Sequence, residues 1–443
     1  MSLIDGSRSG AAADLHASGP AGRPAGDPPK VLVAQLGARR HYAVPAALHS
    51  AGALHGLYTD LYLGPGRASG LLRSLSSGLG IPALKRLAGR TSEGIPAARI
   101  RAFPLFGAEY KVRATIARRR QRLTKTWIWA GRAFNRRCLQ AGLGAAEVVY
   151  AYSSAALEVF EAAKARGIKC VLDHATAPRH LEMALVQREI DRYPGWGAPE
   201  AHDPWLDEYV ERQRAEAILA DQILCGSAFV RTLVEEAWGL GHKCSIVPLG
   251  LRVPAEPAVR EPRTEGPLRV LFVGDEPIRK GLPELAAAAE MVPPETCHFR
   301  AVGDLDLAEP GRRQAARRID LRPRAARAEM NGHYDWADVL VLPSVSDTFA
   351  IVVLEALARG VPAIVSTNTG AADAIVAGMN GFVTPPFEPA PIAEALGVLA
   401  ADRSLLNSMS QASQESVRAF DIQTYADRLV QALGHKVETA PSV

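Results

Sequence analysis

The segment VLFVGDEPIRKG, residues 270–281, decides how the chain is interpreted. Its first four residues form an apolar run typical of a buried strand, and Gly274 begins the turn that follows. Two cations, Arg279 and Lys280, come just before a helix that we expect to start near Leu282. Helix N-termini expose unpaired N–H groups and carry a partial positive charge, so this arrangement favours binding of a diphosphate. The alternative interpretation is a solvated basic turn.

The alternation of strand, turn and helix recurs on both sides of this segment. Further apolar runs that predict strands lie at residues 31–34, 148–152, 170–173, 222–225, 246–248, 299–302, 339–342 and 363–365. Helical patterns separate them, as in nucleotide-binding α/β domains. A proline-rich stretch at 252–267 interrupts the series, which then begins afresh. The sequence therefore predicts an α/β protein with two doubly wound, Rossmann-like domains facing an interdomain cleft.

The domain boundaries follow from the same pattern. Residues 1–29 are rich in Ala, Gly, Pro and Ser and lack an apolar period, which predicts a disordered leader. We expect an N-terminal domain at 30–251, a linker at 252–267, a C-terminal domain at 268–419, and a final helix and tail at 420–443. One arrangement open to this final helix is to pack back on the N-terminal domain.

Composition excludes several classes of protein. The chain has 443 residues, of which 48% are hydrophobic and 22% charged, so it can bury sizeable cores. A net charge of +4 is too weak a field for a general nucleic-acid binder. No apolar run approaches the roughly 18 residues of a membrane span. The five cysteines are scattered without a C-x-x-C pair, and no signal pattern opens the chain, so we expect reduced thiols and a cytoplasmic location.

Two acidic residues follow the strand predicted at 339–342. Asp347 lies in the loop, and Glu355 lies within an almost wholly apolar helix over 350–359. A carboxylate on such a helix needs a partner, because an unpaired buried charge is costly. That partner is either an internal arginine or a pair of ligand hydroxyls. We favour ligand hydroxyls, because Asp347 flanks the start of the same helix.

A third candidate follows the strand predicted at 363–365. Gly370 permits either positive φ or a close approach of backbone, and Asn380-Gly381 makes the next turn. The alternative is a pair of ordinary surface turns. All three candidates come at the C-terminal ends of predicted parallel strands, where open α/β sheets bind ligands.

With these motifs in place, residues 270–386 resemble the retaining glycosyltransferases of family 4, which have the GT-B fold. The resemblance rests on Gly274, Arg279-Lys280-Gly281, Pro343-Ser344, Asp347-x7-Glu355, Thr369-Gly370 and Asn380-Gly381-Phe382-Val383. The N-terminal half matches more loosely, at Gln35-Leu36-Gly37, at 221–230 and at 247–251. The resemblance implies a hexosyltransferase-type enzyme that moves a sugar from a nucleotide-diphosphate donor to a glycan, lipid or small-molecule acceptor.

The resemblance also implies roles for particular residues. In such enzymes the C-terminal domain holds most of the donor and the N-terminal domain the acceptor. Arg279 and Lys280 would hold the diphosphate, Asp347 would meet sugar hydroxyls, and Glu355 would meet the ribose. The other implied donor-binding positions are Gly37, Gly274, Phe349, Ala350, Ile351 and Gly370; at Phe349, Ala350 and Ile351 the backbone N–H groups would act.

His174 and the metal requirement complete the expected site. His174 follows the strand that ends at Asp173 and resembles a histidine that lines the acceptor side, with a surface histidine as the alternative. No set of metal ligands appears, and the family generally needs no metal, so we expect no cofactor beyond the donor. Asp347 and Asp373 stand at positions where the family that the chain resembles usually has glutamate, so the identity of the donor sugar stays open.

A basic stretch lies apart from these motifs. Between Lys111 and Arg137 there are ten Lys and Arg residues and no acid, with apolar residues at near-helical spacing and Trp129 as an interfacial aromatic. One interpretation is a basic amphipathic helix on an anionic membrane surface, at the inner face of the membrane. The alternative is a solvated helix that packs on its own domain. Nucleic acid is disfavoured, because no stacking platform lies nearby.

Two other functions remain open. A GT-B-type epimerase or phosphorylase would share the fold, although a phosphorylase needs a pyridoxal lysine for which the sequence offers no context. A nucleotide-sugar-binding protein without transferase activity would share the donor motifs. The presence of Lys280 and Glu355 argues against that last alternative.

Overall fold

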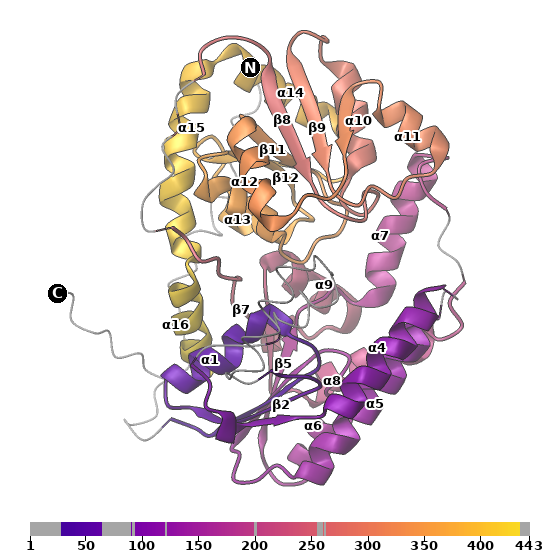
Figure 1. Ribbon diagram of the computed structural model, residues 1–443, viewed down its shortest axis with the longest axis vertical. Coiled ribbons are helices and arrows are strands. Elements are labelled where there is room, and N and C mark those ends of the chain that lie inside the picture. The colour runs from indigo at the N-terminus through magenta and orange to yellow at the C-terminus, as the bar shows by residue number, and fades with distance from the viewer. Residues whose placement is uncertain are drawn as a thin grey trace, which may run out of the picture.

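The computed structural model describes residues 28–63, 90, 94–119, 122–198, 202–254, 260 and 263–434. Most of the expected leader, part of the linker and the end of the tail lie outside these residues. The described chain forms two parallel β-sheets, each packed against helices, one above the other in Figure 1.

The first sheet has seven strands in the order β3-β2-β1-β4-β5-β6-β7, all parallel. They are β1 (Val31–Gln35), β2 (Leu54–Thr59), β3 (Ile100–Ala102), β4 (Val148–Tyr152), β5 (Lys169–His174), β6 (Gln222–Cys225) and β7 (Cys244–Ile246). Since β1 pairs with both β2 and β4, the strand order reverses at β1. This reversal is the kind of position at which open α/β sheets bind ligands.

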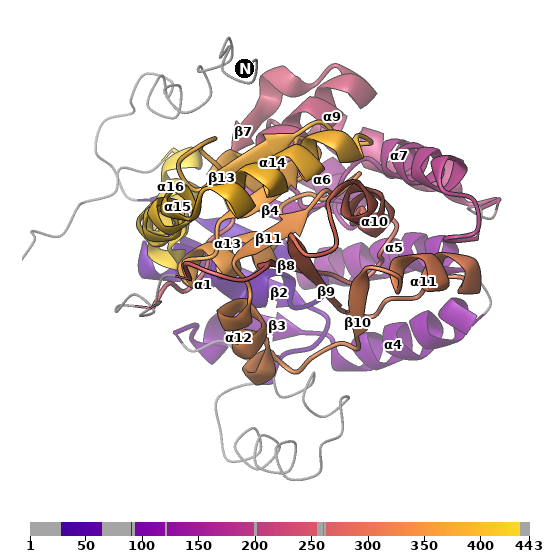
Figure 2. The ribbon, with the colours of Figure 1, turned by 90° about the horizontal axis from the view of Figure 1, so that it is seen from above.

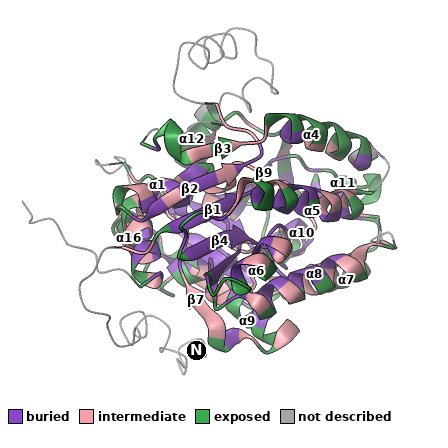
Figure 3. Ribbon diagram, turned by 90° about the horizontal axis from the view of Figure 1, so that it is seen from below, coloured by how far each residue is buried: buried purple, intermediate pink, exposed green. Residues whose placement is uncertain are grey.

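Helices cover both faces of the first sheet. One face carries α1 (Ala43–Ser50) and α16 (Ile422–Ala432), and the other carries α5 (Leu123–Ala141), α6 (Leu157–Lys164), α8 (Leu206–Leu219) and α9 (Ala228–Trp238). Strand alternation explains the division, because Val31 and Val33 enter the core beneath α1 while Leu32 and Ala34 enter the opposite core. The central strands are accordingly buried throughout (Figure 3).

The second sheet has six parallel strands in the order β10-β9-β8-β11-β12-β13. They are β8 (Leu268–Val273), β9 (Cys297–Val302), β10 (Ile319–Arg322), β11 (Val339–Leu342), β12 (Ala363–Ser366) and β13 (Gly381–Thr384). Its helices are α10 (Leu282–Met291), α11 (Glu309–Ala315), α12 (Arg327–Trp336), α13 (Ile351–Ala358), α14 (Pro389–Ala401) and α15 (Arg403–Ser416). They share one continuous apolar core with the strands.

The turn before α10 explains why Gly281 is required. Gly281 caps the helix with φ of 77°, a conformation that other residues rarely adopt. A Cβ atom there would lie 2.0 Å from the backbone oxygen of Pro343. Glycine therefore lets the β8–α10 turn touch the loop that follows β11, which brings the first two sequence motifs together.

The two domains meet through α7 (Arg179–Arg192) and through direct hydrogen bonds. Trp196 Nε1 donates to Gln314 Oε1 at 3.0 Å, and Val186 and Ile190 of α7 share an apolar cluster with Phe387 of the second domain. The helices α15 and α16 follow one another along one edge of the molecule, so the chain returns to the first domain (Figures 1 and 2).

In the described residues no helix is long and apolar enough to span a bilayer.

The basic stretch departs from its prediction. It does not form one helix but two, α4 (Pro104–Arg119) and α5. The apolar residues Ile128, Phe134 and Cys138 of α5 are buried in the domain core, whereas Val112 and Ile116 of α4 are exposed. Trp129 lies 4.3 Å from the Arg113 guanidinium, so its ring packs within the protein. A uniform amphipathic helix was therefore wrong, because the apolar spacing crosses a break between two helices with different surroundings.

Candidate functional site

The side chains of Lys280 and Asp347 form the centre of the predicted site. Lys280 Nζ makes an ion pair with Asp347 Oδ2, although 67 residues separate the two in the chain. Both side chains are largely buried, at 13% and 8% exposed. The cation predicted to hold diphosphate and the acid predicted to meet sugar hydroxyls are therefore direct neighbours.

Arg279 joins the same two segments. Its Nη1 donates to the backbone oxygen of Ser346 at 2.8 Å, and its Nε donates to Glu276 at 2.8 Å. Burial lowers the pKa of Arg279, but the carboxylates of Asp347 and Glu276 outweigh burial and the net pKa is raised. Arg279 therefore stays protonated and fixes the loop that carries Asp347.

The loop from Asp347 to Ala350 leads directly into α13. Phe349 N donates to Asp347 Oδ1 at 3.3 Å, which turns the carboxylate toward the start of the helix. Ala350 adopts φ of 63° and ψ of 69°, a strained conformation for a residue with a Cβ atom. The helix begins at Ile351 with no side-chain cap and no acid in its first turn. The positive end of its dipole thus lies beside the two cations.

Glu355 lies one turn further along α13 and is half-buried. Its Oε2 accepts a hydrogen bond from Tyr334 of α12 at 2.8 Å. Burial and the neighbouring Glu355 carboxylate both raise the pKa of Tyr334, so the phenol stays a donor. From the sequence we expected an arginine or ligand hydroxyls as the partner of Glu355. The prediction missed Tyr334, because no motif in the segment around Tyr334 indicates this contact.

Gly370 is required for packing between the domains. Its N–H donates to Asp347 O at 2.7 Å. A Cβ atom would lie 2.1 Å from Thr348 O and 2.6 Å from Ser227 Oγ. Ser227, at the start of α9, donates its hydroxyl to Thr348 O at 2.8 Å. Of the two reasons that the sequence offered for Gly370, the structure has the close approach: the backbone of Thr348 in its own domain and the side chain of Ser227 across the domain interface.

Asp373 also serves the interface. Its Oδ2 accepts from Ala228 N, at the first turn of α9, at 2.7 Å. Burial raises the pKa of Asp373, and the hydrogen bond from Ala228 opposes that rise. This acid therefore caps a helix of the first domain.

The remaining glycines differ in what surrounds them. Gly37 has φ of 87°, and its N–H donates to Asp60 Oδ1 at 3.0 Å. Among the described residues, no atom lies within 4 Å of the position that a Cβ atom on Gly37 would take. A Cβ atom on Gly274 would lie 3.1 Å from Lys280 Cγ, so Gly274 leaves room for the lysine stem.

His174 is buried, which contradicts the surface histidine that the sequence left as the alternative. It is the last residue of β5, is fully buried, and packs 5.4 Å from Trp238 between ring centroids. Neither ring nitrogen has a hydrogen-bond partner among the described residues. Burial lowers the pKa of His174 to about 4, so the imidazole is neutral at physiological pH. It is not a surface histidine, and in this structure it reaches no exposed face, because strand alternation turns it into the packed side of the sheet.

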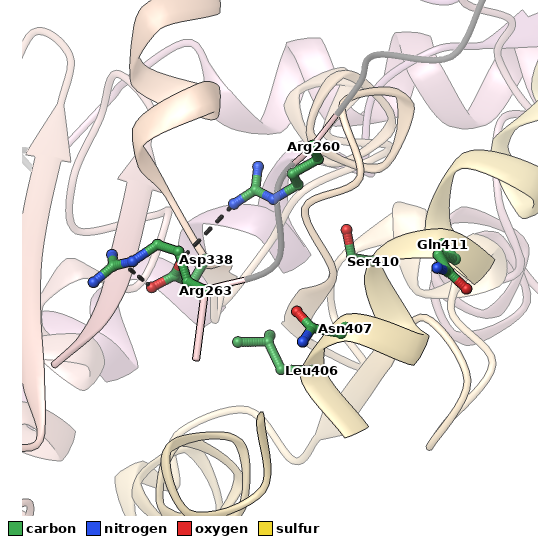
Figure 4. A pocket seen from close by; sticks show the side chains of 7 residues that line it. All are labelled: Arg260, Arg263, Asp338, Leu406, Asn407, Ser410 and Gln411. Atoms are coloured by element: carbon green, nitrogen blue, oxygen red, sulfur yellow. Dashed lines mark hydrogen bonds and ion pairs between the residues drawn. The ribbon is translucent and has the colours of Figure 1, made fainter. Parts of the chain in front are cut away.

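A small polar pocket lies away from these residues, beside α15. It is lined by Arg260, Arg263, Asp338, Leu406, Asn407, Ser410 and Gln411. Figure 4 shows Asp338 between the two arginines, with ion pairs of 3.8 Å to Arg260 and 3.2 Å to Arg263. The pocket contains none of the residues that the sequence predicted. Within the described ranges, no three His, Cys, Asp or Glu side chains gather as a metal site would require.

One family model matches most of the second domain. Residues 267–402 match the family model described as "Glycosyl transferases group 1". Glycogen synthase of Mycobacterium tuberculosis strain H37Rv is 28% identical over 259 residues, which is 55% of this chain and 60% of that protein. D-inositol 3-phosphate glycosyltransferase of Corynebacterium jeikeium is 30% identical over 120 residues, 26% of this chain and 29% of that protein. The chain thus matches less than two thirds of these relatives.

Solved structures cover nearly the whole chain. Sucrose-phosphate synthase from Thermosynechococcus elongatus superposes with a TM-score of 0.57 at 16% identity, covering 91% of this chain and 98% of that one. Anabaena HepE in complex with UDP gives a TM-score of 0.58 at 15% identity, covering 91% and 99%. These likenesses confirm the predicted fold class, two Rossmann-like domains in the GT-B arrangement.

Proposed function

We propose that this protein is a retaining glycosyltransferase of the family 4 type, which transfers a sugar from a nucleotide diphosphate to an acceptor. The observation that carries the proposal is the ion pair between Lys280 and Asp347, with Arg279 on the same loop. Both motifs lie within the region that matches the glycosyltransferase family model. In a nucleotide sugar the sugar is bonded directly to the diphosphate. A cation for the diphosphate next to an acid for the sugar hydroxyls therefore suits that ligand.

The geometry supports a division of roles along α13. Arg279 and Lys280 would stabilise the negative charge that develops on the leaving diphosphate, aided by the dipole of α13. Asp347, beside Lys280 Nζ, would accept from sugar hydroxyls. Glu355 lies two turns after Asp347 and is held by Tyr334, which suits it to the ribose.

We also expect the reaction to need no divalent cation, because Arg279 and Lys280 supply positive charge where a metal would otherwise act. If no metal is needed, activity should persist in excess EDTA. UDP is the first nucleotide to test, because HepE of Anabaena was solved with UDP. Loss of activity in EDTA and its recovery with Mg²⁺ would contradict this expectation.

The experiment that tests the function has two stages. Thermal unfolding with UDP, GDP, ADP and their sugars should identify the donor, because a ligand that binds only the native state raises the midpoint. Release of nucleoside diphosphate from that donor, with water as the slow acceptor, then measures turnover. Donor binding without release, even with a broad set of acceptors, would favour the nucleotide-sugar-binding alternative. No binding of any nucleotide sugar would contradict the proposal altogether.

The exposed face of α4 supports a second part of the proposal, contact with an anionic membrane. Leu105, Val112 and Ile116 are 88%, 59% and 47% exposed, an unusual grouping for one helix of a basic segment. Apolar side chains beside cations are the features that bind anionic bilayer surfaces. This part of the proposal places the protein in the cytoplasm, peripheral to the inner membrane face.

A further inference from the structure

The loop that follows β1 is held in an unusual conformation. Arg40, His41 and Tyr42 have φ values of 49°, 49° and 62°, so three successive residues with side chains adopt left-handed conformations. Such strain persists only where surrounding contacts impose it, and it gathers at functional sites. The loop also contains Gly37, whose Cβ position no atom of the described residues approaches within 4 Å. It lies at the C-terminal end of β1, where the strand order reverses.

Arg40 is the residue that holds the loop. Its Nη1 donates to Tyr425 of α16 at 2.7 Å, and its Nη2 donates to Asp173 of β5 at 2.9 Å. Tyr150 donates to the other oxygen of Asp173 at 2.5 Å. Asp173 is fully buried, so its charge and that of Arg40 balance each other. Arg40 is therefore a structural anchor that ties the loop to β5 and α16.

The preceding residue, Arg39, has no such balance. Its side chain is part-buried, yet within the described ranges it makes no hydrogen bond or ion pair. Arg39 follows β1, which pairs with β4, and Tyr152 is the last residue of β4, so both residues belong to the C-terminal edge of the central strands. The acids closest to the loop are engaged elsewhere: Asp173 by Arg40, and Asp60 by Arg90 at 2.8 Å.

An independent observation points to a ligand at the same place. The hydroxyl of Tyr152 is buried, with 1% of the residue exposed, and has no partner among the described residues. Burial raises the pKa of Tyr152, with the charge of Arg39 acting against that rise, so the phenol remains a hydrogen-bond donor. An unpaired buried hydroxyl is costly unless a ligand or water satisfies it. Arg39 and the Tyr152 hydroxyl, neither with a partner among the described residues, thus follow or end two neighbouring strands, β1 and β4.

We propose that Arg39 binds a phosphate monoester carried by the acceptor substrate, with the Tyr152 hydroxyl as a second donor. The proposal rests on the transferase function above and names the class of its acceptor. Guanidinium groups favour phosphate because their N–H groups match its oxygens in pairs. The position also suits an acceptor, because Arg39 belongs to the first domain whereas the donor residues belong to the second.

Titration of inorganic phosphate tests the site without requiring turnover. We expect wild type to bind phosphate and Arg39→Gln to lose at least about tenfold in affinity. Arg39→Lys should lose less than Arg39→Gln, because it keeps the charge but not the paired N–H groups. Arg136→Gln, which alters an exposed arginine of α5, is the matched control and should bind as wild type does. Lys280→Ala removes a cation of the donor site and serves as a second control. Phosphate binding that survives in Lys280→Ala, but falls in the double variant with Arg39→Gln, takes place at Arg39.

Displacement of phosphate identifies the source of the group. Glucose 6-phosphate should compete if the acceptor is a soluble sugar phosphate, and short-chain phosphatidic acid should compete if it is a lipid, while glucose should not compete. Equal phosphate affinity in wild type and Arg39→Gln would overturn the proposal, as would absence of millimolar phosphate binding to wild type. Failure of the transferase function is distinguishable, because it would show as absent binding or turnover of nucleotide sugars with phosphate binding at Arg39 intact.

Discussion

Glu189 of α7 and Glu284 of α10 meet across the domain interface with both carboxyl groups buried, at 0% and 1% exposed. Arg192 reaches both, at 3.0 Å from Glu284 and 3.9 Å from Glu189. Burial, reinforced by the Glu284 carboxylate, raises the pKa of Glu189 to about 9. Burial also raises the pKa of Glu284. One cation cannot balance two carboxylates, so the pair retains a proton at neutral pH.

This pair predicts a pH dependence of stability. The folded state keeps a proton on the pair of glutamates, whereas the unfolded chain releases it near the ordinary pKa of glutamate. The stability that this proton gives to the folded state is therefore complete below about pH 4 and is lost as the pH rises toward 9. The free energy of unfolding should fall with rising pH by up to about 1.4 kcal/mol per unit for one proton.

Glu189→Gln isolates this effect, because the amide stays neutral. Between pH 7.5 and 9 its midpoint of thermal unfolding should decline less than that of wild type. That window avoids Glu216, where burial raises the pKa only to about 7. Glu211→Gln, at an exposed position of α8, is the control. Parallel declines in wild type and Glu189→Gln would contradict the assignment.

Lys280→Ala should reduce turnover by about 2–4 kcal/mol of activation free energy, the scale for one electrostatic donor. The structure adds a cost in stability of about 3 kcal/mol, because Asp347 would remain buried without its counter-ion. The double variant Lys280→Met with Asp347→Asn removes both charges, so it should regain stability without regaining turnover. Turnover that recovers together with stability would show that the pair only supports the fold.

Glu355→Gln should weaken binding of UDP by about 1.5–3 kcal/mol, the usual range for a hydrogen bond to a charged group. Tyr334→Phe removes the hydroxyl that holds Glu355 and should weaken UDP binding less, since the carboxylate itself remains. Isothermal titration measures both affinities. Loss of stability in both variants with unchanged affinity for UDP would mean that Glu355 is a structural partner of Tyr334.

Vesicles that contain anionic lipid should bind the protein at low salt. Each cation that reaches the surface contributes about 1 kcal/mol, and screening over about 8 Å at physiological ionic strength weakens the attraction. Replacing Leu105, Val112 and Ile116 by Gln should reduce binding in a sedimentation assay, whereas Met291→Gln, an exposed site on α10, should not. If wild type ignores such vesicles, α4 is merely solvated and a soluble acceptor is favoured.

Local patterns were sufficient for most of the fold. Apolar runs such as Val270–Val273 form strands because burial on both faces of a parallel sheet requires continuous apolar sequence. Strands such as β2, β3 and β13 escaped the prediction, because glycine, histidine or arginine interrupts their short apolar runs. The two basic helices were misjudged for a related reason: spacing shows which residues share a face, but not what covers that face.

The sequence by itself determined the two βα series, the cations before α10 and the acids around the start of α13, because each depends on residues close together in the chain. Only the tertiary structure decided their partners. Lys280 meets Asp347 across 67 residues, Glu355 meets Tyr334 of another helix, and Gly370 meets Ser227 of the other domain. For the same reason His174 is buried, and Arg39 has no hydrogen-bond or ion-pair partner among the described residues. Periodicity determines the direction of a side chain within its own element, whereas its partner depends on how distant elements pack.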